Sequence, residues 1–106
     1  MALEKLTVID ELVKVIEEKD KVLFLKNSTT CPISHEAFRQ YEKFANEMEE
    51  NMYYLNVQEA RSFSNEIAER FNVKHESPQV LLFKNGEVTW HASHWEITTK
   101  KLKEQY

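Results

Sequence analysis

Two short apolar runs, each standing between longer segments of helical periodicity, place the strongest constraint on the fold. The first, KVLFLK, is nearly all apolar from Val22 to Leu25, which is typical of a strand covered on both faces. The second, NMYYLNV at 51–57, is rich in aromatic and β-branched residues and also predicts a buried strand. Because a helix-like segment precedes and follows each run, the pattern indicates consecutive βα units.

The helical segments are recognised by apolar residues that return every three or four positions. Residues 6–21 form the first of these segments. The longest begins at Pro32 and carries one continuous apolar stripe as far as Met48. A third segment spans 59–73. These three segments predict helices that pack their apolar faces onto a sheet.

The C-terminal part of the chain predicts a hairpin and a short helix. Two strand-like runs, VLLFK and EVTWHA, are joined by Asn85 and Gly86, the pair that a type I′ turn prefers. The last helix begins either with Ser93 as its cap or, in a shorter version, with Thr98. The order α-β-α-β-α-β-β-α predicts an α/β fold in which helices flank a central four-stranded mixed sheet, as a single domain over 1–106.

Composition excludes several classes of function. The 14 basic and 18 acidic residues are interspersed without a long basic run, so we do not expect a nucleic-acid partner. A single glycine, Gly86, cannot build a glycine-rich phosphate loop. No apolar run approaches the ~20 residues that span a bilayer. The N-terminus lacks a signal-peptide core, so we expect a cytoplasmic protein with no membrane partner.

The only cysteine lies between the first buried strand and the longest helix, in the stretch NSTTCPISH. Pro32 suits the first helical turn, which makes Cys31 the N-cap or its neighbour. Unpaired backbone N–H groups and the positive end of the helix dipole then face the sulfur and stabilise a thiolate. Free cysteine has a pKa of ~8.5, and helix N-termini lower it to roughly 3.5–7.5. The sequence therefore predicts that Cys31 is a catalytic nucleophile.

Polar residues surround Cys31, and we expect Thr30, Pro32 and Ser34 to support it. Ser34 lies on the same helical turn, where its hydroxyl could donate a hydrogen bond to the thiolate or could simply be tolerated. His35 could polarise the thiolate, although an exposed, solvated histidine is the favoured interpretation. No three or four ligands at zinc-site spacing occur, so no metal is expected.

The order of a strand, a Cys-x-x-Ser site, a long helix, a βα unit and a Ser-Pro before a hairpin resembles the thioredoxin fold over essentially the whole chain. More narrowly, TCPIS with SPQVLLFKNGEVTWHASHWEIT resembles the monothiol bacilliredoxins, the YtxJ-like family. This resemblance implies a thiol-disulfide oxidoreductase that removes bacillithiol from S-bacillithiolated cytosolic proteins. Cys31 would take up the bacillithiol. Because the chain has no second cysteine, an outside thiol, most simply bacillithiol as co-substrate, would release it.

The resemblance also implies a substrate-binding role for Ser77 and Pro78. Thioredoxin-fold proteins place a cis-proline opposite the reactive cysteine, and the backbone of the preceding residue pairs with the substrate. The residues alone leave the isomer of Pro78 open. Lys26, Lys74 and Lys84 could supply positive charge near the site, or they could be plain solvated surface.

Two alternatives stay open beside this interpretation. A monothiol glutaredoxin would use glutathione, but such proteins typically carry a glycine in the active-site motif and a Gly-Gly pair, which this chain lacks. A non-catalytic thioredoxin-like redox-sensing or binding module would use Cys31 only as a modifiable handle. We expect bacillithiolated proteins and bacillithiol as partners, no bound cofactor, and a monomer.

Overall fold

The computed structural model describes residues 3–106, which form five strands, four α-helices and one 3₁₀ helix. In chain order the elements are β1 Leu3–Lys5, α1 Ile9–Glu18, β2 Lys21–Asn27, α2 Pro32–Met48, β3 Met52–Asn56, α3 Arg61–Phe71, β4 Gln79–Lys84, β5 Glu87–Ser93, η1 His94–Glu96 and α4 Thr99–Gln105. The strands form one mixed sheet in the order β1-β3-β2-β4-β5. Strand β3 is parallel to both β1 and β2, whereas β4 is antiparallel to β2 and to β5.

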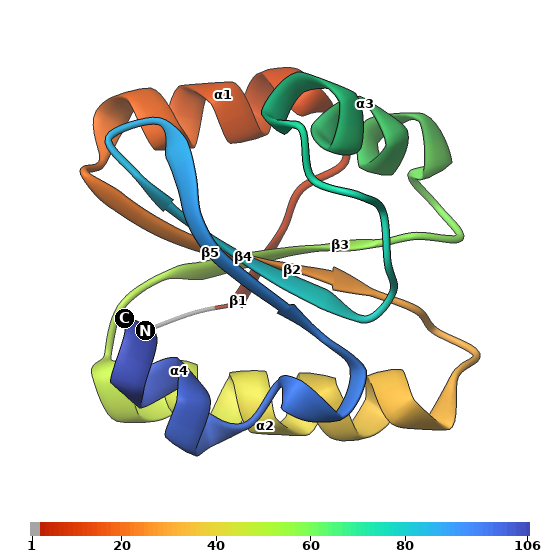
Figure 1. The fold of residues 1–106 in the computed structure, drawn as a ribbon, viewed down its shortest axis with the longest axis vertical. Helices are drawn as coiled ribbons and strands as arrows, with labels where there is room; N and C mark the ends of the chain where they lie inside the picture. Colours follow the sequence, from red (N-terminus) through yellow and green to blue (C-terminus); the bar gives the residue numbers. More distant parts are fainter. Residues whose placement is uncertain (1–2) are drawn as a thin grey trace.

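Helices cover both faces of the sheet, with α1 and α3 on one face and α2 and α4 on the other (Figure 1). Central strands buried on both faces require such a double layer. In β2, Val22 and Phe24 join the core that includes α1 and α3 residues, whereas Leu23 and Leu25 join the core that includes α2 residues. The predicted α/β fold, with helices on both sides of a mixed sheet, is confirmed.

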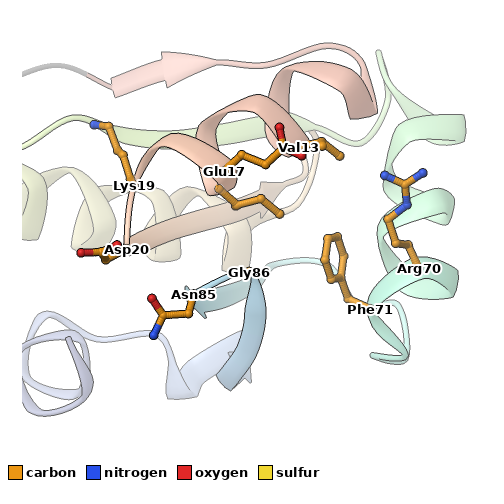
Figure 2. A pocket seen from close by; sticks show the side chains of 9 residues that line it. Val13, Glu17, Lys19, Asp20, Arg70, Phe71, Asn85 and Gly86 are labelled. Atoms are coloured by element: carbon orange, nitrogen blue, oxygen red, sulfur yellow. The ribbon is translucent and has the colours of Figure 1, made fainter.

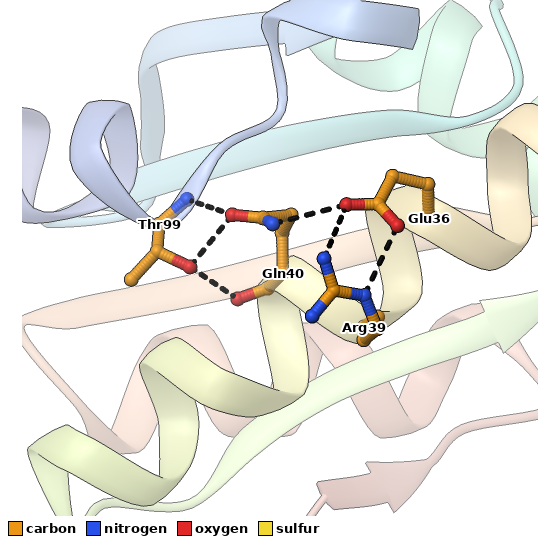
Figure 3. Close-up of polar contacts among 4 residues, drawn as sticks. All are labelled: Glu36, Arg39, Gln40 and Thr99. Atoms are coloured by element: carbon orange, nitrogen blue, oxygen red, sulfur yellow. Dashed lines mark hydrogen bonds and ion pairs between the residues drawn. The ribbon is translucent and has the colours of Figure 1, made fainter.

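Polar contacts in the middle turns of α2 hold this helix against the sheet and against α4. Tyr41 is fully buried, and its hydroxyl lies 2.9 Å from the Leu23 carbonyl oxygen and 2.7 Å from that of Tyr53. The side-chain oxygen of Gln40 accepts a hydrogen bond from the Thr99 N–H at 2.7 Å and lies 2.8 Å from the Thr99 hydroxyl (Figure 3). These contacts fix the helix whose N-terminus begins the candidate site.

The hairpin and the last helix follow the sequence prediction. Asn85 and Gly86 both have positive φ, 52° and 84°, as a type I′ turn requires. The shorter version of the last helix is correct, because the Thr98 hydroxyl accepts a hydrogen bond from the Lys101 N–H at 3.1 Å as the N-cap of α4. Ser93 instead precedes the 3₁₀ helix η1.

The prediction of four strands is wrong, because β1 adds a fifth. Strand β1 has three residues, two of them charged and exposed, so it carries no alternating apolar pattern that a sequence could reveal. Its position comes from backbone pairing with β3, which the Leu6 N–H extends by donating to the Tyr54 carbonyl at 2.8 Å. For the same reason the first helix begins at Ile9, later than the predicted residue 6.

Candidate active site

Cys31 lies just beyond the end of β2, at the edge of the sheet formed by the carboxyl ends of the parallel strands β2 and β3. It is the N-cap of α2, with extended backbone angles (φ −103°, ψ 124°), and Pro32 is the first helical residue. Its thiol is free and half-buried. The predicted position of the cysteine at a helix N-terminus is confirmed, and open α/β sheets bind ligands at this same edge.

Backbone amides at the start of α2 lower the pKa of the Cys31 thiol below its ordinary value. The Ser34 N–H has the largest effect, partial desolvation opposes it, and the Ile33 N–H and the Ser34 hydroxyl add smaller lowering effects. Within helix α2 the sulfur forms no capping hydrogen bond of ordinary geometry, so these groups act on it as oriented dipoles. A thiolate is the reactive form of cysteine, so this environment favours nucleophilic chemistry.

Ser34 turns into the protein and connects the helix to the loop before Cys31. It is fully buried, and its hydroxyl oxygen accepts a hydrogen bond from the Ser28 N–H at 3.3 Å. The same hydroxyl helps to lower the pKa of the Cys31 thiol. Ser34 is therefore a packed, hydrogen-bonded residue, and its part in any reaction stays a prediction.

The remaining neighbours of Cys31 lie on the surface. Pro32 is exposed, and the Thr30 hydroxyl oxygen accepts a hydrogen bond from the Gln58 side-chain amide at 3.2 Å. His35 is exposed, as favoured, and its Nε2 lies 3.3 Å from the Thr29 carbonyl oxygen. The imidazole thus has a partner other than the sulfur.

Ser77 and Pro78 lie at the same edge of the sheet as Cys31. Their peptide bond is cis, which answers the question that the sequence left open. The following residue, Gln79, pairs with Lys26 near the end of β2, and the Pro78 carbonyl accepts a hydrogen bond from the His94 N–H at 3.1 Å. Their substrate-binding role remains a prediction.

Lys26 is neither solvated surface nor a free charge beside the sulfur. Its side chain is fully buried, where Nζ donates to the Ser64 carbonyl oxygen at 3.1 Å and lies 3.2 Å from His75 Nδ1. Burial lowers the pKa of Lys26 to about 8. The pKa of His75 is lowered mainly by burial and, to a smaller extent, by the positive charge of Lys26. Lys26 therefore connects β2 to α3 and to the segment before Ser77.

The other two lysines occupy different places. Lys74 is exposed in the segment that leads to Ser77. Lys84 is also exposed, but it pairs with Lys21 at the start of β2, at the edge opposite Cys31. Of the exposed pair, only Lys74 lies in a segment that reaches the candidate site.

Sequence reasoning missed two residues at this edge. Gln58 follows β3 and makes three hydrogen bonds to the loop that leads to Cys31. Trp95 lies on η1 and is 68% exposed, next to the residue that donates to the Pro78 carbonyl. The available signal for Gln58 was a polar residue in the loop that begins where a parallel strand ends, because the carboxyl ends of neighbouring parallel strands lie side by side.

A surface groove elsewhere on the chain is separate from this site (Figure 2). It lies between the end of α1, the end of α3 and the turn of the β4–β5 hairpin. Its lining residues are Val13, Ile16, Glu17, Lys19, Asp20, Arg70, Phe71, Asn85 and Gly86. The hairpin turn lies next to the start of β2, whereas Cys31 follows the end of β2. The groove and Cys31 are therefore at opposite ends of the strands.

Comparison with known proteins gives the family. Residues 4–102 match monothiol bacilliredoxin BrxC. The chain belongs to the monothiol bacilliredoxin family. A solved structure described as having a thioredoxin fold is 46% identical to this bacilliredoxin, with a TM-score of 0.93, and the match covers 96% of this chain and 91% of that chain.

Two thioredoxins resemble this bacilliredoxin in fold alone. A mutant thioredoxin from Halobacterium salinarum is 19% identical, with a TM-score of 0.76 over 96% of this chain and 85% of that chain. The Malassezia sympodialis thioredoxin is 18% identical, with a TM-score of 0.76 over 97% and 86%. The family and the fold together support a thiol redox function.

The part of this bacilliredoxin that the structure describes, 3–106, has neither a membrane-spanning helix nor a metal-ligand cluster. No helix there is both long enough and apolar enough to cross a membrane. No group of three or more His, Cys, Asp or Glu side chains there is arranged to hold a metal ion.

Ser34→Ala should raise the pKa of Cys31 in this bacilliredoxin. The substitution removes one of the dipoles that stabilise the thiolate and leaves the Ser28 N–H without its acceptor. Because only the thiolate reacts, the rate of alkylation plotted against pH should have its inflection below ~8.5 in the parent and closer to that value in the variant. Ser62→Ala, an exposed serine on α3, is the matched control. A parent inflection at the free-cysteine value would contradict the low pKa.

Proposed function

We propose that this chain removes bacillithiol from S-bacillithiolated cytosolic proteins. The observation that carries the proposal is a lone thiol with a lowered pKa at the N-terminus of α2, in a chain of the monothiol bacilliredoxin family. A cysteine without a second cysteine cannot close an internal disulfide, so its product must be a mixed disulfide.

The reaction proceeds as two thiol–disulfide exchanges. In the first, the Cys31 thiolate attacks the bacillithiol sulfur of the protein–bacillithiol disulfide. The bond between the target sulfur and the bacillithiol sulfur breaks, and a bond between the Cys31 sulfur and the bacillithiol sulfur forms. The target thiolate leaves and takes up a proton. In the second, the thiolate of another bacillithiol attacks the same bacillithiol sulfur and releases the Cys31 thiolate. The net result is the exchange of one disulfide for another: the target sulfur is reduced to a thiol, the sulfur of the second bacillithiol is oxidised and gives up its proton, and the two bacillithiols leave as bacillithiol disulfide.

The surrounding residues have assigned parts in this proposal. The Ser34 and Ile33 amides stabilise Cys31 both as attacking thiolate and as leaving group. Thr30 and Pro32 shape the approach to the sulfur, and the Ser77 backbone before Pro78 pairs with the incoming disulfide. The common position of these groups at one edge of the sheet supports the assignment.

A comparison of two substrates tests the proposal. One target protein is prepared with either bacillithiol or glutathione on the same cysteine, and its release is followed by intact mass with the matching free thiol present. We expect faster release from the bacillithiolated form. Equal rates on both forms would contradict the choice of bacillithiol over the glutathione used by glutaredoxins. No acceleration on either would favour the sensing or binding module.

A further inference from the structure

Gln58 connects the loop after β3 to the loop that carries Cys31. Its side-chain oxygen accepts a hydrogen bond from the Thr29 N–H at 3.0 Å. Its amide nitrogen donates to the Ser28 hydroxyl oxygen at 2.7 Å and to the Thr30 hydroxyl oxygen at 3.2 Å. One side chain therefore contacts each of the three residues that immediately precede the sulfur-bearing residue.

Ser28 passes this restraint on to the start of α2. Its hydroxyl is bound by Gln58, and its backbone N–H donates to the Ser34 hydroxyl oxygen at 3.3 Å. Ser28 is 9% exposed and Ser34 is fully buried, so neither can move freely. A continuous series of contacts thus runs from Gln58 through Ser28 to Ser34, whose amide and hydroxyl act on the Cys31 sulfur.

We propose that Gln58 is a positioning residue that sets the reactivity of Cys31 by holding Ser28 and, through it, Ser34 in place. Gln58 itself is exposed, so it contributes little to the hydrophobic core. Its side chain is neutral, so it restrains the loop without adding a negative charge that would disfavour the thiolate. The proposal rests on the proposed function only for its biological meaning, because the reactivity of Cys31 is measurable without any bacillithiol.

The first test is Gln58→Ala, with the alkylation rate of Cys31 measured against pH. Loss of the three contacts frees the loop, so the sulfur is held less firmly against the Ser34 amide. We expect the inflection to move upward by about half a pH unit toward ~8.5, while the plateau rate at high pH is kept. His35, four residues after Cys31, and Glu59, the residue after Gln58, are unchanged in the variant, so their influence cancels in the comparison.

Gln40→Ala is the matched control. Gln40 also fixes a distant segment through hydrogen bonds, but it lies in the middle of α2 and holds Thr99 (Figure 3). Its loss should lower thermal stability and leave the inflection unchanged. An unchanged inflection in Gln58→Ala, or an equal shift in Gln40→Ala, would overturn the proposal in favour of a purely structural role.

Gln58→Glu separates geometry from charge. Its carboxylate can accept from the same Thr29 N–H and from both hydroxyls, so the loop stays held. The added negative charge near the sulfur should still raise the inflection, and 1 M salt should reverse most of that rise because the Debye length falls to about 3 Å. If the inflection rises in Gln58→Glu and 1 M salt does not reverse the rise, the substitution has displaced the loop, which contradicts the expectation that a carboxylate holds it in place.

A double variant tests the route through Ser34. If Gln58 acts through Ser28 and Ser34, the inflection shift in Gln58→Ala/Ser34→Ala should be smaller than the sum of the two single shifts. Fully additive shifts would overturn this route. These readouts also separate the two proposals. If the inflections shift as predicted but no bacillithiol is released, only the proposed function is contradicted. If bacillithiol is released but the inflection of Gln58→Ala is the same as in the parent, only this inference is contradicted.

Discussion

Cys31→Ala is expected to reduce the release of bacillithiol from a modified target protein to the rate measured with no bacilliredoxin added. Cys31 is the only cysteine in the chain, and its sulfur is the atom that would accept the bacillithiol. No other side chain can form the mixed disulfide, so the loss should be complete and not partial. Intact-mass measurement of the target, sampled over time, gives this rate directly.

Stoichiometric trapping sharpens this first prediction. Without any free thiol, the parent chain should release one target thiol per Cys31 and then stop, carrying one bacillithiol itself. Cys31→Ser preserves the shape of the site and serves as the control, and it should carry no adduct. Turnover beyond one equivalent without added thiol would contradict a mechanism that depends on an outside thiol for the second exchange.

Lys26→Met is expected to stabilise the protein at neutral pH. Within 3–106 no carboxylate pairs with the buried Lys26 ammonium group, and burying an uncompensated charge is unfavourable. His75 keeps a partner without Lys26, since His75 Nδ1 also lies 3.2 Å from the Ser64 hydroxyl oxygen. Methionine has a similar length and no charge. We expect the free energy of unfolding to rise by about 2–3 kcal/mol near pH 7.

The pH dependence of this difference fixes its cause. The pKa of Lys26 is about 8 in the folded protein and 10.5 in its ordinary environment. Between these values the unfolded chain binds more protons than the folded one, so the parent gains stability as the pH rises. The advantage of Lys26→Met should therefore be complete below pH 8 and should shrink as the pH approaches 10.5.

Urea unfolding of both proteins between pH 7 and 10.5 measures the effect. Lys100→Met removes an exposed lysine on α4 and should change stability by no more than about 0.5 kcal/mol. If Lys26→Met destabilised the protein at every pH, the hydrogen bonds to Ser64 and His75 would outweigh the cost of burying the charge.

Strong local patterns allowed most of the fold to be predicted from the sequence. The long apolar stripe after Pro32 and the Asn85-Gly86 turn are each encoded within a few neighbouring residues, and both predictions are confirmed. Strand β1 had no such pattern, because only its backbone pairing with β3 makes it a strand. Local periodicity predicts an element well, but it cannot predict a partner that lies about fifty residues away.

In the candidate site, too, the residues with a local sequence signal were found, and those whose contacts are distant in sequence were missed. Cys31 could be found because a cysteine followed by proline after a buried strand is a local signal. The burial of Lys26 was missed because the apolar run ends at Leu25, although β2 continues to Asn27 and turns Lys26 toward the same face as Phe24. The contacts of Gln58 join segments about thirty residues apart, so no local pattern encodes them.

Strand β1 has a consequence for self-association. An open sheet edge can recruit a strand from a second molecule, and proteins prevent this with short edge strands and exposed charges. Within the described residues 3–106, β1 offers three residues at this edge of the sheet, with Glu4 and Lys5 exposed, and the Lys5 ammonium group lies 3.0 Å from the Glu59 carboxylate. Along Leu3–Lys5 a further strand would meet a short row of backbone groups, two exposed charged side chains and a lysine that is already held by an ion pair. This edge therefore gives a physical reason to expect that no second molecule extends the sheet beyond β1.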